Sequence, residues 1–253
     1  MPAAARRHFG IIAPLSGTLV RSLQLCGLNR RIDNTDGCTV VCGILSSILY
    51  AAMTVVIAMQ WEGYSSASQT ISELSAVGAP TRPVWVRLVA VYTVLVTAFG
   101  WGIWRSAGRN RALRIVGSLI LAYGLLGVLW PFAPMHLREV LAAGGGTRSD
   151  TLHLVLASVT VLLMLLAIGC AASAFGKPFR RYSIATLAIL AAFGAMTFVD
   201  APRLAANLPT PWVGVWERIN IGVFLLWVVV LAVALLRAKD TAARTAGRPA
   251  LAA

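Results

Sequence analysis

Long apolar runs alternate with short polar segments along most of this 253-residue chain. A helix needs about 20 apolar residues to cross about 30 Å of hydrocarbon, and six of the runs are long enough. An isolated strand cannot cross lipid because its backbone groups would stay unpaired, so the runs predict helices and not barrel strands. The six predicted spans are residues 38–60, 84–104, 113–132, 152–175, 182–199 and 219–236. The pattern therefore predicts an all-α, six-helix membrane bundle.

A weaker apolar pattern precedes the first run. Residues 9–28 place apolar side chains on one helical face, but they also include Pro14 and Arg21. This favours an interfacial helix lying on the membrane, with a seventh span as the alternative. The chain then divides into a basic N-terminal segment (1–37), a membrane domain (38–236) and a basic, disordered tail (237–253).

Composition agrees with a chain solvated by lipid. Hydrophobic residues make up 58% of the sequence and charged residues 12%, about half the charged fraction of a typical soluble domain. A cytosolic enzyme or a nucleic-acid module is therefore excluded, although the net charge is +13.

The distribution of charge predicts an orientation. Segments 1–37, 105–114, 176–181 and 237–253 together hold sixteen Lys and Arg against three acids, and the alternate segments hold six of each sign. Basic residues accumulate on the cytoplasmic side of membrane proteins, so both termini are predicted to be cytoplasmic. The positive charge is then a topology signal. We expect the protein to lie in the inner membrane of a bacterium, with membrane lipids and no nucleic acid as its partners.

Small residues suggest how the helices pack. The run 182–199 contains Ala188 and Ala192, as well as Ala191 and Ala195, each pair four residues apart. Small residues let helices approach closely in lipid. We therefore predict that this fifth span is the central, tightly packed helix.

Candidate chemistry lies on the predicted outer rim, because the apolar runs have almost no ionisable residues at their centres. Asp150 and His153 are three apart on one helical face, a spacing that suits an acid/base pair, with Glu73 as a second carboxylate. The alternative is that Asp150 caps a helix and His153 is an interface residue. Thr70 and Glu73 have the spacing of a capping box, which predicts a short helix.

Further polar residues on this rim are candidates for ligand binding. Arg218 or Arg203 could hold a phosphate or carboxylate, or Arg218 could pair with Glu217 or Asp200. Two histidines could hold a metal or haem, but two are few ligands, so we predict no cofactor. The ligand-binding candidates are Ser72, His136, Asp200, Arg203, Glu217 and Arg218.

Several short motifs carry a family resemblance. They are Tyr64–Ala79, Asp150-Thr151-Leu152-His153, Phe179–Ser183 and Trp216-Glu217-Arg218. Together they resemble a bacterial membrane family catalogued as domain of unknown function 998. The resemblance covers about residues 40 to 236. It implies a six-helix membrane protein and brings no established activity.

Three functions fit these observations. The first is a membrane protein whose polar outer pocket binds a lipid headgroup or another amphiphile. The second is a membrane-embedded hydrolase or transferase that uses Asp150, His153 and Glu73, and the third is a non-catalytic scaffold or accessory subunit. An enzyme requires Glu73 and His153 to approach each other, with Asp200 or Glu217 beside them, whereas a scaffold leaves each residue satisfied locally.

Overall fold

The computed structural model describes residues 37–246. These residues contain six helices long and apolar enough to cross a membrane, so the predicted six-span bundle is confirmed. The predicted helix at residues 9–28 lies outside the described part of the chain. The spans are Gly37–Gln60, α2 (Arg82–Ser106), α3 (Arg111–Leu126) with its continuation η3 (Gly127–Phe132), α5 (Arg148–Ala171), α6 (Lys177–Val199) and α8 (Val213–Ala246).

Local sequence signals set several of these boundaries. The Asn110 side chain accepts a hydrogen bond from the Leu113 amide at the start of α3, which satisfies a backbone donor that the helix leaves free. Thr147 and Asp150 form a capping box at the start of α5. Proline stands in the first turn of both α2 and α6, where its missing amide hydrogen costs no helical bond.

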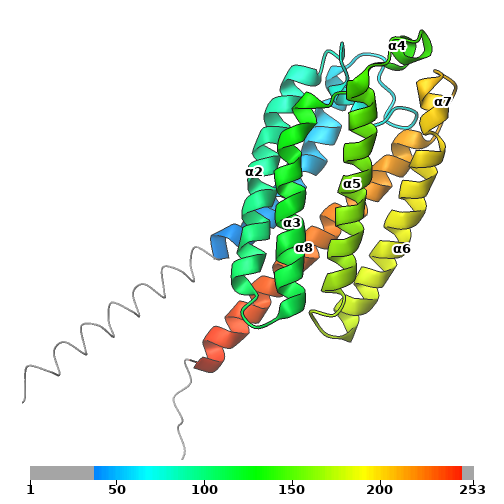
Figure 1. The fold of residues 1–253 in the computed structure, drawn as a ribbon. Helices are drawn as coiled ribbons and strands as arrows, with labels where there is room; N and C mark the ends of the chain where they lie inside the picture. Colours follow the sequence, from blue (N-terminus) through cyan, green and yellow to red (C-terminus); the bar gives the residue numbers. More distant parts are fainter. Residues whose placement is uncertain (1–36, 247–253) are drawn as a thin grey trace, which may run out of the picture. The chain divides into compact units, whose positions relative to one another are not determined.

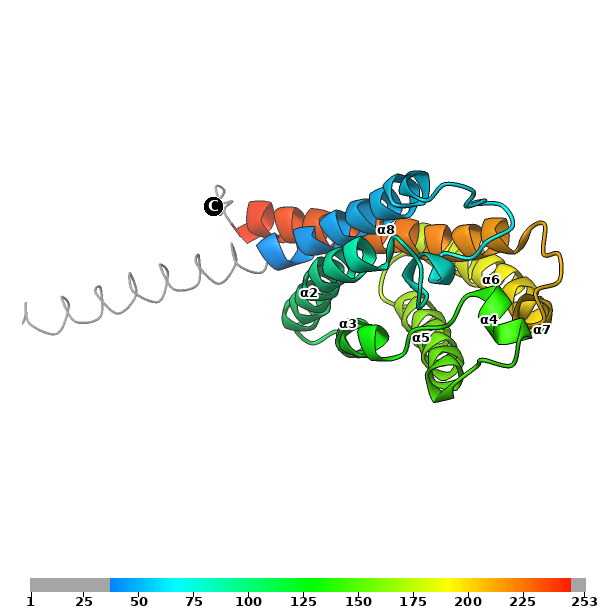
Figure 2. The same ribbon diagram turned by 90° about the horizontal axis from the view of Figure 1, so that it is seen from above.

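The six spans form a ring within residues 39–246. Consecutive contacts join α2 to α3, α3 to α5, α5 to α6 and α6 to α8. The first span closes the ring, because the Ser47 hydroxyl bonds the Leu225 carbonyl of α8 at 3.1 Å and Tyr50 packs on Trp85 and Tyr92 of α2. Figure 2 shows the first span and α8 side by side along one edge.

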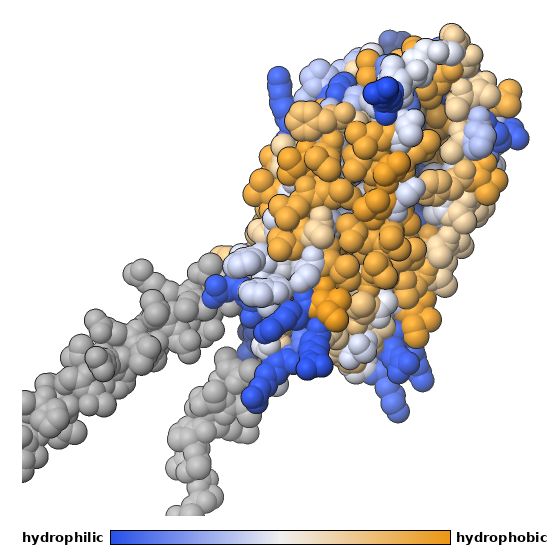
Figure 3. Space-filling view, in the orientation of Figure 1, coloured by the Kyte–Doolittle hydropathy of each residue, from blue (hydrophilic) through white to orange (hydrophobic). Residues whose placement is uncertain are grey.

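The two ends of the bundle differ. One end, the loop-rich end, carries η2 (Ser72–Ser75), α4 (Arg138–Ala142) and α7 (Ala201–Ala205) with their connecting loops (Figure 1). The other, the arginine-rich end, carries the short turns at 107–110 and 172–176 and the last turns of α8. Figure 3 shows a broad hydrophobic surface between hydrophilic residues at the two ends, as a membrane protein requires.

The prediction that the fifth span, α6, is the central and tightly packed helix is wrong. In α8, 44% of the most apolar stretch is buried, against 17% in α6. Ala188 and Ala192 are exposed on α6, while its buried face carries Ser183, Thr186, Leu190 and Gly194. Small residues permit close packing without requiring it. Polar contacts decide the face instead, because Asn220 of α8 donates to the Leu190 carbonyl at 2.6 Å.

Glycine residues bring α2 and α3 into close contact. A Cβ atom added at Gly117 would lie 2.6 Å from the Trp104 nitrogen, and one added at Gly100 would lie 2.5 Å from the Leu121 nitrogen. These distances are shorter than real Cβ contacts, so the two backbones can approach only because glycine stands at the crossing.

Candidate functional site

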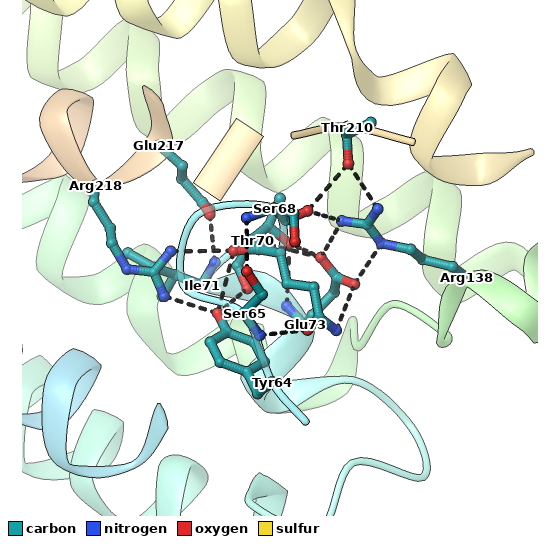
Figure 4. Close-up of polar contacts among 11 residues, drawn as sticks. Tyr64, Ser65, Ser68, Thr70, Ile71, Glu73, Arg138, Thr210, Glu217 and Arg218 are labelled. Carbon is teal, nitrogen blue, oxygen red and sulfur yellow. Dashed lines mark hydrogen bonds and ion pairs between the residues drawn. The ribbon is translucent and has the colours of Figure 1, made fainter. Parts of the chain in front are cut away.

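A buried ion pair holds the loop-rich end together. Arg138 Nε donates to Glu73 Oε1 at 2.6 Å and Nη2 donates to Oε2 at 2.8 Å. Glu73 is 1% exposed and Arg138 9%. The remaining guanidinium contacts reach the Thr210 hydroxyl at 2.7 Å and the Ser68 carbonyl at 2.7 Å (Figure 4). One arginine thus ties the loop before α2, helix α4 and the loop before α8 into a single cap.

The predicted capping box is also present. The Thr70 amide and hydroxyl donate to Glu73 Oε2 at 2.6 and 2.9 Å, and the Glu73 amide donates back to the Thr70 hydroxyl at 3.3 Å. The helix that follows is a single 3-10 turn, Ser72–Ser75. The carboxylate of Glu73 therefore serves both the local turn and Arg138, and its two oxygens are occupied.

Ser72 and Glu217 meet at the start of α8. The Ser72 hydroxyl donates to Glu217 Oε1 at 3.4 Å, and the Ile71 amide donates to the other oxygen of the same carboxylate. Glu217 therefore anchors the η2 turn to α8. Of the two predicted partners of Arg218, neither Glu217 nor Asp200 forms an ion pair with it among the described residues, because Arg218 contacts backbone carbonyls and a tyrosine instead.

Asp150 pairs with His136 and not with His153. Its oxygens accept the His136 amide at 2.7 Å, the His136 ring nitrogen Nδ1 at 2.9 Å and the Thr147 amide at 2.7 Å. This joins the segment before α4 to the start of α5. The capping interpretation of Asp150 is confirmed.

His153 is buried and has a different environment. Its Nδ1 lies 2.9 Å from the Ala133 carbonyl, and because a carbonyl only accepts, Nδ1 carries the hydrogen. The ring meets Trp130 edge-on, with centroids 4.9 Å apart. Within the described residues, no hydrogen bond or ion pair joins His153 to Glu73.

Asp200 and Arg203 form a fourth, looser pair at the junction of α6 and α7. Their closest side-chain atoms are 3.9 Å apart, and Arg203 donates mainly to the Pro209 carbonyl at 2.9 Å. The predicted site residues therefore fall into separate contacts, each linking neighbouring segments of the cap. In the part of the chain that the structure describes, no three His, Cys, Asp or Glu side chains are grouped to hold a metal ion.

A groove, not anticipated from the sequence, opens between the first span and α8. Its volume is about 540 Å³. Tyr64, Ser66 and Ile71 of the loop line its upper end, beside the loop-rich end of the bundle. The remaining walls are mostly apolar: Tyr50, Ala51, Thr54, Val55, Ala58 and Met59 from the first span, and Arg218, Ile221, Gly222 and Leu225 from α8.

Arg218 lies at the upper end of this groove. Its Nη1 donates to the carbonyls of Ser66, Gly214 and Gln69 at 2.7, 3.0 and 3.1 Å. Its Nη2 donates to the Tyr64 hydroxyl at 2.8 Å, and the guanidinium stands 5.7 Å from the centre of the Tyr64 ring. All these acceptors are neutral.

Tyr64 completes this arrangement as an uncharged hydroxyl. It donates to the Thr70 carbonyl at 2.7 Å while accepting from Arg218. Burial raises the pKa of Tyr64 to about 12, and the hydrogen bond and charge of Arg218 offset only part of that rise. The Arg218 charge is therefore not cancelled by a phenolate at neutral pH.

A comparison with known protein families shows which family the chain belongs to. The profile of the DUF998 family, described as a protein of unknown function, matches residues 44–234. The chain belongs to the DUF998 family. Comparison with curated proteins and with solved structures gave no match. For this DUF998 protein, family membership agrees with the six-span fold and assigns no activity.

Two features of this DUF998 protein escaped sequence reasoning for different reasons. Arg138 is not among the candidates that the sequence indicates, because nothing in its local sequence shows that it pairs with Glu73 across a long loop. The groove had a visible signal in Gly222, the smallest residue in a run of Ile, Val, Phe and Leu. A Cβ atom at Gly222 would meet nothing within 4 Å, so this glycine leaves space beside the helix.

Proposed function

We propose that this DUF998 protein binds a membrane amphiphile in the groove between its first span and α8. The observation that carries the proposal is the groove itself, which is apolar along its length and has a cationic, hydrogen-bonding group at its upper end. Its volume of about 540 Å³ lies within the range of about 300–1,000 Å³ typical of small-molecule sites. An apolar cleft with one polar end suits a molecule of the same construction.

The proposal places the protein in the bacterial cytoplasmic membrane with both termini in the cytoplasm. The excess of Lys and Arg at the arginine-rich end supports this orientation. The groove then opens toward the outer leaflet. Reporter fusions after Gly63, Gly145 and Asn207 should report an external position, and fusions after Gly108 and Gly176 an internal one. Reversal of either set would contradict the orientation.

The acids and histidines of the cap have a structural role in this proposal. Glu73 is occupied by Arg138, Asp150 by His136, and the His153 Nδ1 hydrogen by the Ala133 carbonyl. A hydrolase or transferase built on Asp150, His153 and Glu73 would need these groups free to face one substrate. Their contacts favour a binding protein, with lipids and not nucleic acid as partners.

Filling the groove tests the proposal. Gly222→Leu should place a side chain in the empty space and displace the amphiphile, whereas Gly169→Leu is a matched control because an added Cβ at exposed Gly169 meets only Leu187, at 4.0 Å. Native mass spectrometry of protein purified in mild detergent should find one retained lipid on the wild type and on Gly169→Leu. Equal retention by Gly222→Leu would overturn the proposal.

A further inference from the structure

The groove has the depth of one membrane leaflet. Along the first span it runs from Met59, near the loop-rich end, to Tyr50. At a rise of about 1.5 Å per residue, this stretch of helix is about 14 Å long, close to half of the roughly 30 Å hydrocarbon core. Tyr50 lies near the middle of the span Gly37–Gln60. A lipid in the groove would therefore come from the leaflet beside the loop-rich end.

The charge at the mouth of the groove is positive. Arg218 is the single charged side chain among the described residues that line it. Two carboxylates near Arg218 form no ion pair with it among the described residues: Glu217, whose charge still attracts Arg218, accepts from the Ile71 amide and the Ser72 hydroxyl, and Glu73 is paired with Arg138. Neutral carbonyls orient the Arg218 guanidinium without cancelling its charge. An anionic group at the mouth would complete the pairing.

We propose that the occupant of the groove is an anionic phospholipid of the leaflet beside the loop-rich end. This inference rests on the proposed function of the groove as a binding site. Its phosphate lies at Arg218, and one acyl chain follows Gly222 down the groove toward Tyr50. Arginine is suited to this role because its planar guanidinium binds phosphate oxygens with several donors. The Ser66 and Tyr64 segment that covers the groove holds Arg218 in position, so the headgroup meets a fixed donor.

The selectivity of the protein for lipid headgroups tests whether the bound lipid is anionic. Delipidated protein in an uncharged detergent is titrated with dioleoyl phosphatidylglycerol and with dioleoyl phosphatidylcholine, which share the same chains. The wild type should bind the anionic lipid about tenfold or more tightly than the zwitterionic one, because the choline cation of phosphatidylcholine offsets the attraction between its phosphate and Arg218. Salt should reduce this preference. Equal affinities would overturn the anionic assignment and leave the proposed groove intact. Binding of neither lipid would overturn both.

Substitutions separate the headgroup from the groove. Arg218→Gln should lower the preference toward unity while phosphatidylcholine still binds, and Gly222→Leu should abolish binding of both lipids. Arg203→Gln is the control, because exposed Arg203 lies at the same end and does not line the groove. An unchanged preference in Arg218→Gln would overturn the role of Arg218. If that variant fails to fold, the salt dependence of the wild type decides the question.

Crosslinking tests the position of the chain. A phosphatidylglycerol with a photoreactive diazirine in one acyl chain should label peptides containing Tyr50 to Met59 and Ile221 to Leu225. Prior addition of excess unlabelled phosphatidylglycerol should suppress this labelling. Labelling confined to the arginine-rich end, around Lys177 and Arg181, would overturn the placement.

Discussion

Glu73 and Arg138 lie 65 residues apart in the chain and share two hydrogen bonds, of 2.6 and 2.8 Å, inside the cap of the loop-rich end. Both side chains are buried, so each would be costly alone, and each is neutralised by the other. Because Arg138 also bonds Thr210 and Ser68, the pair fixes three loops that otherwise have little regular structure. These loops include the segment that covers the groove and holds Arg218.

Breaking this ion pair should destabilise the protein strongly. Arg138→Met leaves the Glu73 carboxylate buried without its partner, and such a change typically costs about 3–5 kcal/mol. Denaturant unfolding in detergent micelles measures the loss. Arg203→Met is the matched control, since the side chain of Arg203 is 53% exposed, and surface changes usually stay within about 0.5 kcal/mol. Equal stability of the two variants would show that the pair does not hold the cap.

The same residues show where sequence reasoning succeeds. The spacing of three between Thr70 and Glu73 predicts a capping box by a purely local rule, and the reciprocal bonds are present. The partner of Glu73 could not be found in this way. Arg138 begins α4, in the segment between two other spans, and its pairing depends on how these segments fold over the bundle. Six apolar runs determine six helices, but they leave the contacts between loops open.

The contact between α2 and α3 should tolerate no side chain at its closest point. Gly117→Ala would place a Cβ atom 2.6 Å from the backbone nitrogen of Trp104, so the helices must separate, at a cost of about 1–3 kcal/mol. Ala188→Leu on the exposed face of α6 should change stability little. Thermal unfolding of the two variants in detergent compares them directly. A larger loss in Ala188→Leu would restore α6 as the tightly packed helix.

The alanine spacing gave a wrong prediction for α6 because it does not indicate which face of a helix is buried. In α6 the alanines lie beside Ser183, Leu190 and Gly194, which are the residues that face α8. Trp227 donates to the Ser183 hydroxyl at 3.1 Å, and this partner is remote in sequence. Composition can show that a helix packs closely somewhere, but the complementary surface on another helix decides the face.

His153 should behave as a structural donor. His153→Leu removes the donor to the Ala133 carbonyl and leaves a buried acceptor unsatisfied, which costs about 1–3 kcal/mol. His153→Asn keeps an amide donor near the position of Nδ1 and should recover part of that loss. Denaturant unfolding of both variants tests the expectation, and lipid retention should persist in His153→Asn. Loss of lipid binding in a stably folded His153→Asn would instead place this histidine in the binding site.

Alkaline pH should weaken the fold through Tyr64. Its folded pKa of about 12 exceeds the ordinary value of 10.0, so between these values the unfolded chain releases a proton that the folded chain retains. The stabilisation is complete below about pH 10 and is lost as pH rises through about 12. The ultraviolet absorbance of phenolate, recorded for the wild type minus Tyr64→Phe after a rapid pH jump, should show a step near pH 12. Stability of Tyr64→Phe should fall less steeply across the same interval. A step near pH 10 would mean that Tyr64 is open to solvent, and the segment that covers the groove would then be displaced from Arg218.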